Sequence, residues 1–301
     1  MKKKFHTSLL MKNKFHTSLL SLAALAMSIG SANAAAVIYE PFDYDAGNIG
    51  AVGGSTGLNG TWGANRAGVK SGDLSFAGLE TTTGTNYGGK TSNRIAGGAG
   101  AGADSIGTAG LLADGATLWF SALVDTTTIN ASTGRAYVGI GTTYVDGFDR
   151  YGANGSGDEG IGFVLENKTL STHAWYSNGG QSVASGTLLG TGTQLIVGRI
   201  TWGALGETID LYTPSGDLSS AGTAVATMTT TINLDQLGAT LAADKFDTAT
   251  FGGSGDSNTD SYYAVDDMRY GASYLDVVPV PEPSTTLLGA LGFLALLRRR
   301  R

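Results

Sequence analysis

The sequence predicts an all-β protein, folded as an antiparallel β-sandwich. Glycine accounts for 47 of the 301 residues, about twice its ordinary share, and the glycines separate short apolar runs, as turns separate strands. Helical periodicity is short throughout, and only Leu234–Leu241 suggests a helix within the main part of the chain. Runs such as Leu195–Val197 are apolar at successive positions, which predicts strands that lie between two layers and favours a sandwich over a single open sheet.

The predicted strands are the runs rich in β-branched and aromatic residues. They are Ala36–Tyr39, Leu118–Val124, Ala136–Ile140, Ile161–Leu165, Thr172–Tyr176, Gln194–Trp202, Thr208–Tyr212, Thr223–Met228, Lys245–Phe251 and Tyr262–Tyr270. The stretch Gly97–Gly110 consists of small residues without periodicity. We expect it to be a flexible surface loop or a polar spacer between subdomains.

The N-terminal segment has the pattern of a secretory signal peptide. A basic start at Lys12–Lys14 precedes the apolar run Leu19–Ile29, and Ala32 and Ala34 form a small-x-small cleavage site for signal peptidase. The mature chain is therefore expected to begin near Ala35. We expect the signal peptide to be helical and exclude it from the fold.

The start of the chain contains a tandem copy. Lys4–Leu10 recurs letter for letter as Lys14–Leu20. This repeat is either a true duplication or the result of a start codon assigned too early, in which case Met11 is the true start. The predicted signal peptide is the same in both cases.

The C-terminal segment has the order of a sorting signal. Pro281, Glu282 and Pro283 precede an apolar stretch, and the segment closes with the basic residues Arg298, Arg299, Arg300 and Arg301. The prolines stiffen the chain, and terminal arginines remain on the cytoplasmic side of a membrane. The apolar stretch from Ser284 to Leu297 has fourteen residues, fewer than the ~20 of a stable helical span. A short hydrophobic helix that anchors only transiently is therefore favoured over an ordinary permanent anchor.

These residues resemble the PEP-CTERM sorting signal. The resemblance implies processing by an exosortase, a membrane transpeptidase of Gram-negative, polysaccharide-producing bacteria that is thought to cleave near the Pro-Glu-Pro motif. It implies transient anchoring in the inner membrane, followed by display at the cell surface or release outside the cell.

Three segments follow: a signal peptide (1–34), an ectodomain (35–278) and a sorting signal (279–301). Nine of the 19 Lys and Arg residues and one of the 25 Asp and Glu residues lie in the two terminal segments. The ectodomain thus carries 10 basic and 24 acidic side chains, a net charge of −14. Such a charge repels nucleic acid. The chain contains no cysteine, which excludes disulfides, thiol catalysis and cysteine metal sites.

The ectodomain also resembles a known class of exported domain. The segments that carry the resemblance are Tyr39–Tyr44, Gly57–Trp62, Leu195–Trp202, Ile209–Tyr212 and Val265–Gly271. They look like the concanavalin A-like, laminin-G-like jelly-roll domains that often precede PEP-CTERM tails. In that sandwich the first and last strands typically pair, so we expect the two ends of the ectodomain to lie side by side.

No catalytic site is predicted. Glycosidases of the jelly-roll superfamily place carboxylates on one strand as Glu-x-Asp-x-x-Glu, and this run is absent. The acidic pair Asp158-Glu159 is expected to be a solvated turn. His173 is the sole histidine of the ectodomain, too few for a site with several histidines, and is expected to be a half-exposed strand residue.

One acidic loop has the order of a calcium site. Asp256, Asn258, Asp260 and Asp267 place oxygen ligands at positions 1, 3, 5 and 12, as calcium loops do. Position 6 lacks the usual glycine, and an ordinary turn before the last strand is the alternative. In an extended strand Asp266 and Asp267 would point to opposite faces, with one of them facing inward. A same-face ion pair between Asp267 and Arg269 is the alternative.

Exposed aromatic rings would indicate sugar binding. The candidates are Trp62, Tyr87, Tyr144, Tyr151, Trp175, Tyr176, Tyr262 and Tyr263, whereas Trp119, Trp175 and Trp202 are expected first of all to pack within the fold. Tyr144, Phe148 and Tyr151 lie among Gly, Asp and Asn and are the predicted carbohydrate contacts.

Three functions are consistent with the sequence. The first is a non-enzymatic protein of the cell surface or extracellular matrix that binds polysaccharide or calcium. The second is a dedicated carbohydrate-binding module, and the third is a glycoside hydrolase or lyase of the same fold. The partners common to all three are signal peptidase and exosortase.

Overall fold

A computed structural model describes residues 36–280 of the chain, except for 51–52, 54, 66, 82–85, 91–95, 128–134, 142–159, 177–179, 232–233, 235–245, 247 and 255–263. Contacts divide the chain into two units, Met1–Asn33 and Ala34–Arg301, and every described residue belongs to the second unit. The predicted signal-peptidase site at Ala32 and Ala34 and the tail 281–301 lie outside the described residues.

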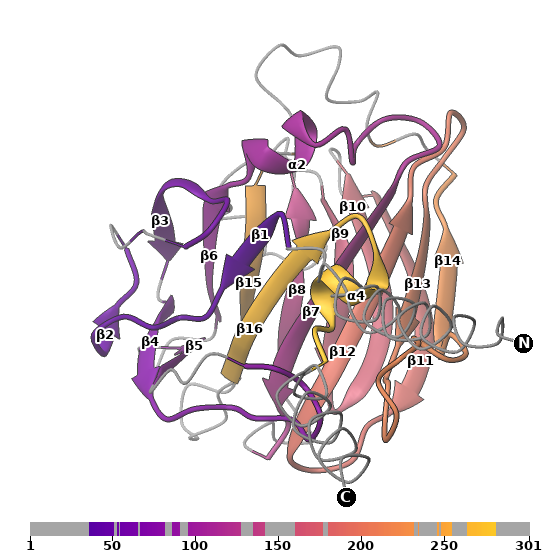
Figure 1. Ribbon diagram of the computed structural model, residues 1–301. Coiled ribbons are helices and arrows are strands. Elements are labelled where there is room, and N and C mark those ends of the chain that lie inside the picture. The colour runs from indigo at the N-terminus through magenta and orange to yellow at the C-terminus, as the bar shows by residue number, and fades with distance from the viewer. Residues whose placement is uncertain are drawn as a thin grey trace, which may run out of the picture. The chain divides into compact units, whose positions relative to one another are not determined.

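The described residues form two antiparallel sheets (Figure 1). In spatial order, the first sheet consists of β14 (Ala226–Thr229), β13 (Thr208–Tyr212), β12 (Thr193–Thr201), β7 (Thr117–Asp125), β16 (Ala264–Gly271), β5 (Asn86–Lys90), β4 (Ala67–Ser71) and β2 (Gly47–Asn48), with β1 (Ile38–Glu40) paired to β16. The first and last strands therefore pair, as the resemblance implied.

The second sheet consists, in spatial order, of β11 (Gly180–Leu188), β10 (Thr169–Tyr176), β9 (Gly160–Glu166), β8 (Arg135–Gly141), β15 (Thr248–Ser254), β6 (Ala96–Gly102) and β3 (Asn59–Asn65). Two short helices, α2 (Asp104–Thr108) and α4 (Tyr274–Val277), complete the described secondary structure. In the hairpin between β9 and β10, Asn167 and Lys168 both have positive φ, as a two-residue type I′ turn requires.

The main hydrophobic core combines alternate side chains of both sheets. Phe120 of β7 stacks on Phe163 of β9 and on Tyr270 of β16, and all three rings are buried. Gly198 of β12 makes room for this column, since a Cβ atom there would come within 2.1 Å of the Phe120 ring. The predicted β-sandwich is therefore confirmed.

A second apolar cluster covers the opposite face of the first sheet. Leu195 and Val197 of β12 point into this cluster, whereas Ile196 between them belongs to the main core. Residues 72–81, 213–225 and 272–280, which we call the outer cover, supply the other side of the cluster: Leu74, Leu79, Leu218, Val277 and Val278. The successive apolar positions of Leu195–Val197 therefore arise because β12 lies between two layers, as predicted, although one of them is built from loops and α4.

The predicted strands all overlap observed strands, but several strands were not predicted. The clearest error is Gly97–Gly110, which was expected to be a loop or spacer. Its first part is β6, which pairs with both β15 and β3, and its second part contains α2. The residues of β6 are only Ala and Gly, so hydrogen bonds to its neighbours form the strand without any apolar pattern in the sequence.

Candidate functional site

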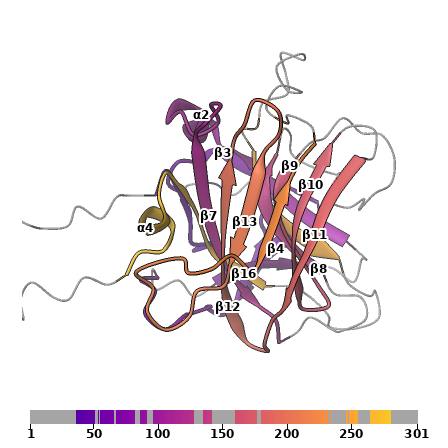
Figure 2. The same cartoon turned by 90° about the vertical axis from the view of Figure 1, so that its right-hand side faces the viewer.

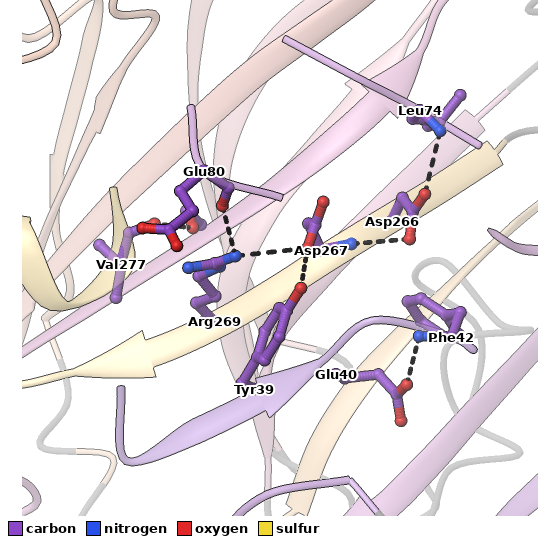
Figure 3. Close-up of polar contacts among 10 residues, drawn as sticks. Tyr39, Glu40, Phe42, Leu74, Glu80, Asp266, Asp267, Arg269 and Val277 are labelled. Atoms are coloured by element: carbon purple, nitrogen blue, oxygen red, sulfur yellow. Dashed lines mark hydrogen bonds and ion pairs between the residues drawn. The ribbon is translucent and has the colours of Figure 1, made fainter. Parts of the chain in front are cut away.

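The pairing of β1 with β16 brings three of the buried carboxylates, those of Glu40, Asp266 and Asp267, into one region (Figure 3). Tyr39 lies opposite Arg269 and Glu40 opposite Met268. In β16 the register against β7 shifts between Asp266 and Arg269, which is the signature of a β-bulge. Asp267 occupies the bulge with φ of 47°. Strand pairing and the bulge together determine where the acidic side chains lie.

Glu40 is fully buried and accepts hydrogen bonds from four groups. The Phe42 backbone N–H donates to Oε1 over 2.6 Å, while Tyr44 Oη and Trp62 Nε1 donate to Oε2 over 2.9 and 2.7 Å. The Ser55 hydroxyl also donates to Oε2. Burial raises the pKa of Glu40, and these hydrogen bonds oppose the rise. Glu40 thus fixes the residues that follow β1 and has no exposed surface for chemistry.

Asp266 connects β16 to the outer cover. Its Oδ2 accepts a hydrogen bond from the Leu74 N–H over 3.1 Å, and its Oδ1 accepts one from the Asp267 N–H over 2.9 Å. Burial, followed by the neighbouring charge of Asp267, raises the pKa of Asp266 to about 8. The two backbone donors favour the ionised form but do not outweigh burial.

Asp267 forms a group with Arg269, which is also buried, and with the half-buried Tyr39. The Tyr39 hydroxyl donates to Asp267 Oδ1 over 2.5 Å, and Arg269 Nη2 lies 3.4 Å from the same oxygen. Arg269 also lies over the Tyr39 ring, 4.1 Å from its centroid, and donates to the Glu80 carbonyl over 2.8 Å. Burial raises the pKa of Asp267, and the Tyr39 hydroxyl and Arg269 oppose the rise. The ion pair between Asp267 and Arg269, which the sequence left open as an alternative, is present.

The contacts of Asp267 do not favour a role as a calcium ligand. The residue is 3% exposed, and a bound cation would have to displace Arg269 and the Tyr39 hydroxyl from the oxygen that they share. The other three predicted ligands, Asp256, Asn258 and Asp260, lie outside the described residues. Within the described ranges no cluster of three or more His, Asp or Glu side chains is arranged to hold a metal ion. The calcium loop therefore stays a prediction that depends on residues 256–260.

An aromatic group on the outer face of the first sheet was not predicted. Trp119 of β7 stacks on Tyr212 of β13 and meets the edge of Tyr274 of α4, with ring centroids 5.7 Å apart in both pairs. Arg199 of β12 lies 5.5 Å from the Trp119 ring centroid and forms two hydrogen bonds with Asp210 of β13, of 3.1 and 2.6 Å. The opposite charges of Arg199 and Asp210 are cross-strand neighbours, a signal that a pairing of the two predicted strands could have supplied.

This aromatic group holds α4, and α4 leads directly to the C-terminal segment. Ser273 and Asp276 form a reciprocal capping box at the start of α4. Val277 and Val278 are fully buried, the Ser121 hydroxyl donates to the Val277 carbonyl over 2.6 Å, and the Glu80 N–H donates to the Pro279 carbonyl over 2.8 Å. We call residues 273–279 the exit anchor.

The remaining predicted residues fall into two groups. Tyr144, Phe148 and Tyr151 lie outside the described residues. Trp62 was a candidate exposed aromatic, which is wrong: it is buried against Phe42 and Phe251 and donates to Glu40. His173 was expected to be half-exposed but is buried, and burial, followed by the charge of Arg135, lowers its pKa to about 4.

Residues 279–301 match the family described as the PEP-CTERM protein-sorting motif. The chain carries a PEP-CTERM sorting motif. The motif implies an exported protein that is sorted by exosortase after transient anchoring in the membrane. Its first residue, Pro279, is also the residue whose carbonyl accepts a hydrogen bond from Glu80. The PEP-CTERM motif therefore begins inside the exit anchor.

Several solved structures are similar to the chain at low sequence identity. A protein of unknown function from Shewanella oneidensis MR-1 is 12% identical, covers 90% of this chain and 95% of its own, and has a TM-score of 0.42. The binding domain of botulinum neurotoxin serotype D/C is 11% identical over 80% of this chain and 49% of its own, with a TM-score of 0.38. An uncharacterised protein from Mycobacterium paratuberculosis is 10% identical over 77% and 98%, with a TM-score of 0.34.

These similarities are too weak to transfer a ligand or an activity. No curated protein matches the sequence at a significant level. Among the described residues no helix is both long enough and apolar enough to cross a membrane.

Proposed function

We propose that the chain is a non-enzymatic surface protein, which its PEP-CTERM motif delivers to the cell surface or extracellular matrix of a Gram-negative bacterium. The proposal rests on the fact that the folded domain and the sorting motif follow each other directly along the chain. A self-contained β-sandwich ends in the exit anchor, and the sorting motif starts at the same residue, Pro279. In this arrangement the motif determines where the protein is delivered, and the sandwich is the domain that is delivered.

The contacts of the buried carboxylates support a non-enzymatic role. Glu40, Asp266 and Asp267 accept hydrogen bonds from groups of the ectodomain itself. Glu207 does the same, with Thr230 Oγ1 donating over 2.8 Å and the Leu234 N–H over 2.9 Å. A glycosidase instead needs two carboxylates that flank a sugar from opposite sides, one of them free to donate a proton. These four side chains act as internal hydrogen-bond acceptors.

Intact-mass analysis of the mature protein tests the sorting step. In a host that contains the exosortase, we expect a product that begins near Ala35 and lacks Arg298–Arg301. A variant with Glu282→Ala should keep its basic tail, because the Pro-Glu-Pro element is altered while the ectodomain is unchanged. A surface-exposed product of the parent chain that still carries the four arginines would contradict exosortase sorting and support an ordinary anchor.

We propose extracellular polysaccharide as the ligand class of the displayed domain, with Tyr144, Phe148 and Tyr151 as the contacts. Glycan-array binding of the ectodomain, with and without a chelator, separates direct sugar binding from binding that depends on calcium. A triple alanine variant of the three aromatic residues is the matched comparison. Release of reducing ends from bacterial exopolysaccharide by the parent domain would instead favour the hydrolase.

A further inference from the structure

The exit anchor leaves very little free chain between the folded domain and the apolar stretch of the sorting motif. Val278 is fully buried and Val280 is 36% exposed, so the described chain reaches the domain surface at Val280. Seven peptide steps separate Val280 from Leu287, where the apolar stretch becomes continuous, and they span at most ~25 Å even when fully extended. Pro281 and Pro283 further restrict the conformations of this connection.

The exit point lies on one side of the sandwich. The exit anchor belongs to the outer cover, and α4 packs on β7 and β16 of the first sheet. β11 is one of the two edge strands of the second sheet. Figure 2 shows α4 on one side of the two sheets and β11 on the other. Because the connection is short, the side of the domain on which it starts must face the membrane surface in which it ends.

We propose that in the membrane-anchored precursor the ectodomain is held in one orientation, with the outer cover facing the lipid headgroups and β11 facing away from them. This inference rests on the proposed function, because it requires the apolar stretch of the PEP-CTERM motif to enter the bilayer. The interaction surface is the outer cover around α4, and its partner is the lipid surface. The exposed side chain that reports on this surface is Leu275 of α4, which is 52% exposed.

The exit anchor explains why the orientation would be fixed. If the last residues of the ectodomain were free, the connection would lengthen and the domain would tumble on its tether. Instead the capping box, the two buried valines and the hydrogen bonds from Ser121 and Glu80 hold the chain until Pro279. Exosortase would then meet its substrate with the outer cover of the ectodomain beside it.

Single-cysteine labelling tests the orientation. Because the native chain contains no cysteine, each variant is labelled only at the introduced position. Leu275→Cys reports on the outer cover, and Leu188→Cys in β11, where the native side chain is 71% exposed, is the matched control. Each full-length precursor is purified from a host without exosortase, labelled with a fluorophore and placed in phosphatidylcholine vesicles that contain a headgroup-attached quencher. We expect several-fold stronger quenching at position 275 than at position 188.

A third variant isolates the role of the short connection. Twelve Gly and Ser residues inserted between Val280 and Pro281 add a flexible tether of ~20 Å root-mean-square length, and the difference between the two labels should then largely disappear. Three results would overturn the orientation. The first is equal quenching at both positions without the insertion, the second is stronger quenching at position 188, and the third is a difference that the insertion leaves unchanged. Flotation with the vesicles is measured first: a precursor that does not float contradicts membrane anchoring itself, whereas flotation with equal quenching contradicts only the orientation.

Discussion

Asp267 is the residue at which the last strand departs from regular geometry. Val265, Met268 and Tyr270 all point into the main core, a spacing that a flat strand of period two cannot produce. The bulge absorbs the extra residue. Asp266 and Asp267 both lie close enough to Asp73 of the outer cover for its charge to raise their pKa values. The expectation that the two aspartates point to opposite faces is therefore wrong.

Asp266 makes the stability of the ectodomain depend on pH. Its pKa in the folded state, about 8, lies above its ordinary value of 3.8, so the folded state binds the proton more tightly than the unfolded chain does. This contribution to stability is complete below about pH 4 and is lost as the pH rises through about 8. We expect the melting temperature of the parent ectodomain to fall over this range, as measured by thermal denaturation at fixed ionic strength.

The variant Asp266→Asn should flatten that dependence, because an amide keeps an acceptor for the Leu74 N–H and does not ionise. Asp45→Asn, at an exposed position, controls for the loss of one negative charge. If Asp266→Asn and Asp45→Asn follow the parent curve equally, the pH dependence has another source.

The predicted calcium loop is tested by melting temperature as well. A ligand that binds only the native state raises stability by about 2.7 kcal/mol at a hundredfold excess over Kd, which corresponds to a rise of several degrees. Millimolar calcium should produce this rise in the parent ectodomain, and Asp260→Ala should abolish it. An equal response of parent and variant, or an equal effect of sodium chloride at the same ionic strength, would indicate general screening of the acidic surface.

At the scale of elements, the exit anchor is the feature on which the outer cover depends. Ectodomain that ends at Val280 should be stable, whereas ectodomain that ends at Ala272 loses the burial of Val277 and Val278. Burial of each valine contributes about 1.5–3 kcal/mol, and the hydrogen bonds from Ser121 and Glu80 contribute about 1 kcal/mol each. The shorter form should therefore melt lower by at least about ten degrees.

Differential scanning calorimetry of the two truncated forms measures this difference. Ser121→Ala in the longer form is an intermediate case, since it removes one hydrogen bond and keeps the valines. Equal melting temperatures of the forms ending at Val280 and Ala272 would show that the exit anchor does not stabilise the domain.

Strands with a clear run of apolar or β-branched residues could be predicted from the sequence, whereas strands without such a run could not. Strands such as β7 and β12 were predicted because their apolar and β-branched residues are continuous, while β6 was missed because Ala and Gly give no alternation. The pairing of the first and last strands followed from family resemblance. The buried network of Glu40 was not predictable, because its donors come from positions as far apart as Phe42 and Trp62 and only the folded chain brings them together.

At the scale of the whole molecule, the two sheets account for most of the secondary structure that the described residues form. Ectodomain expressed without the signal peptide and the sorting tail should be a soluble monomer, and its circular dichroism spectrum should be dominated by β-structure. Size-exclusion chromatography and circular dichroism measure these properties. A helix content above about a third would refute the sandwich.

The position of β16 within its sheet limits when the protein can fold. β16 pairs with β7, β5 and β1, so the last of the described strands joins three strands that precede it by up to about 230 residues. Contacts of such large sequence separation form slowly. In a chain exported N-terminus first, the first sheet cannot close until residue 271 has crossed the membrane. The ectodomain therefore remains open throughout its translocation, and its folding coincides with the arrival of the sorting segment in the bilayer.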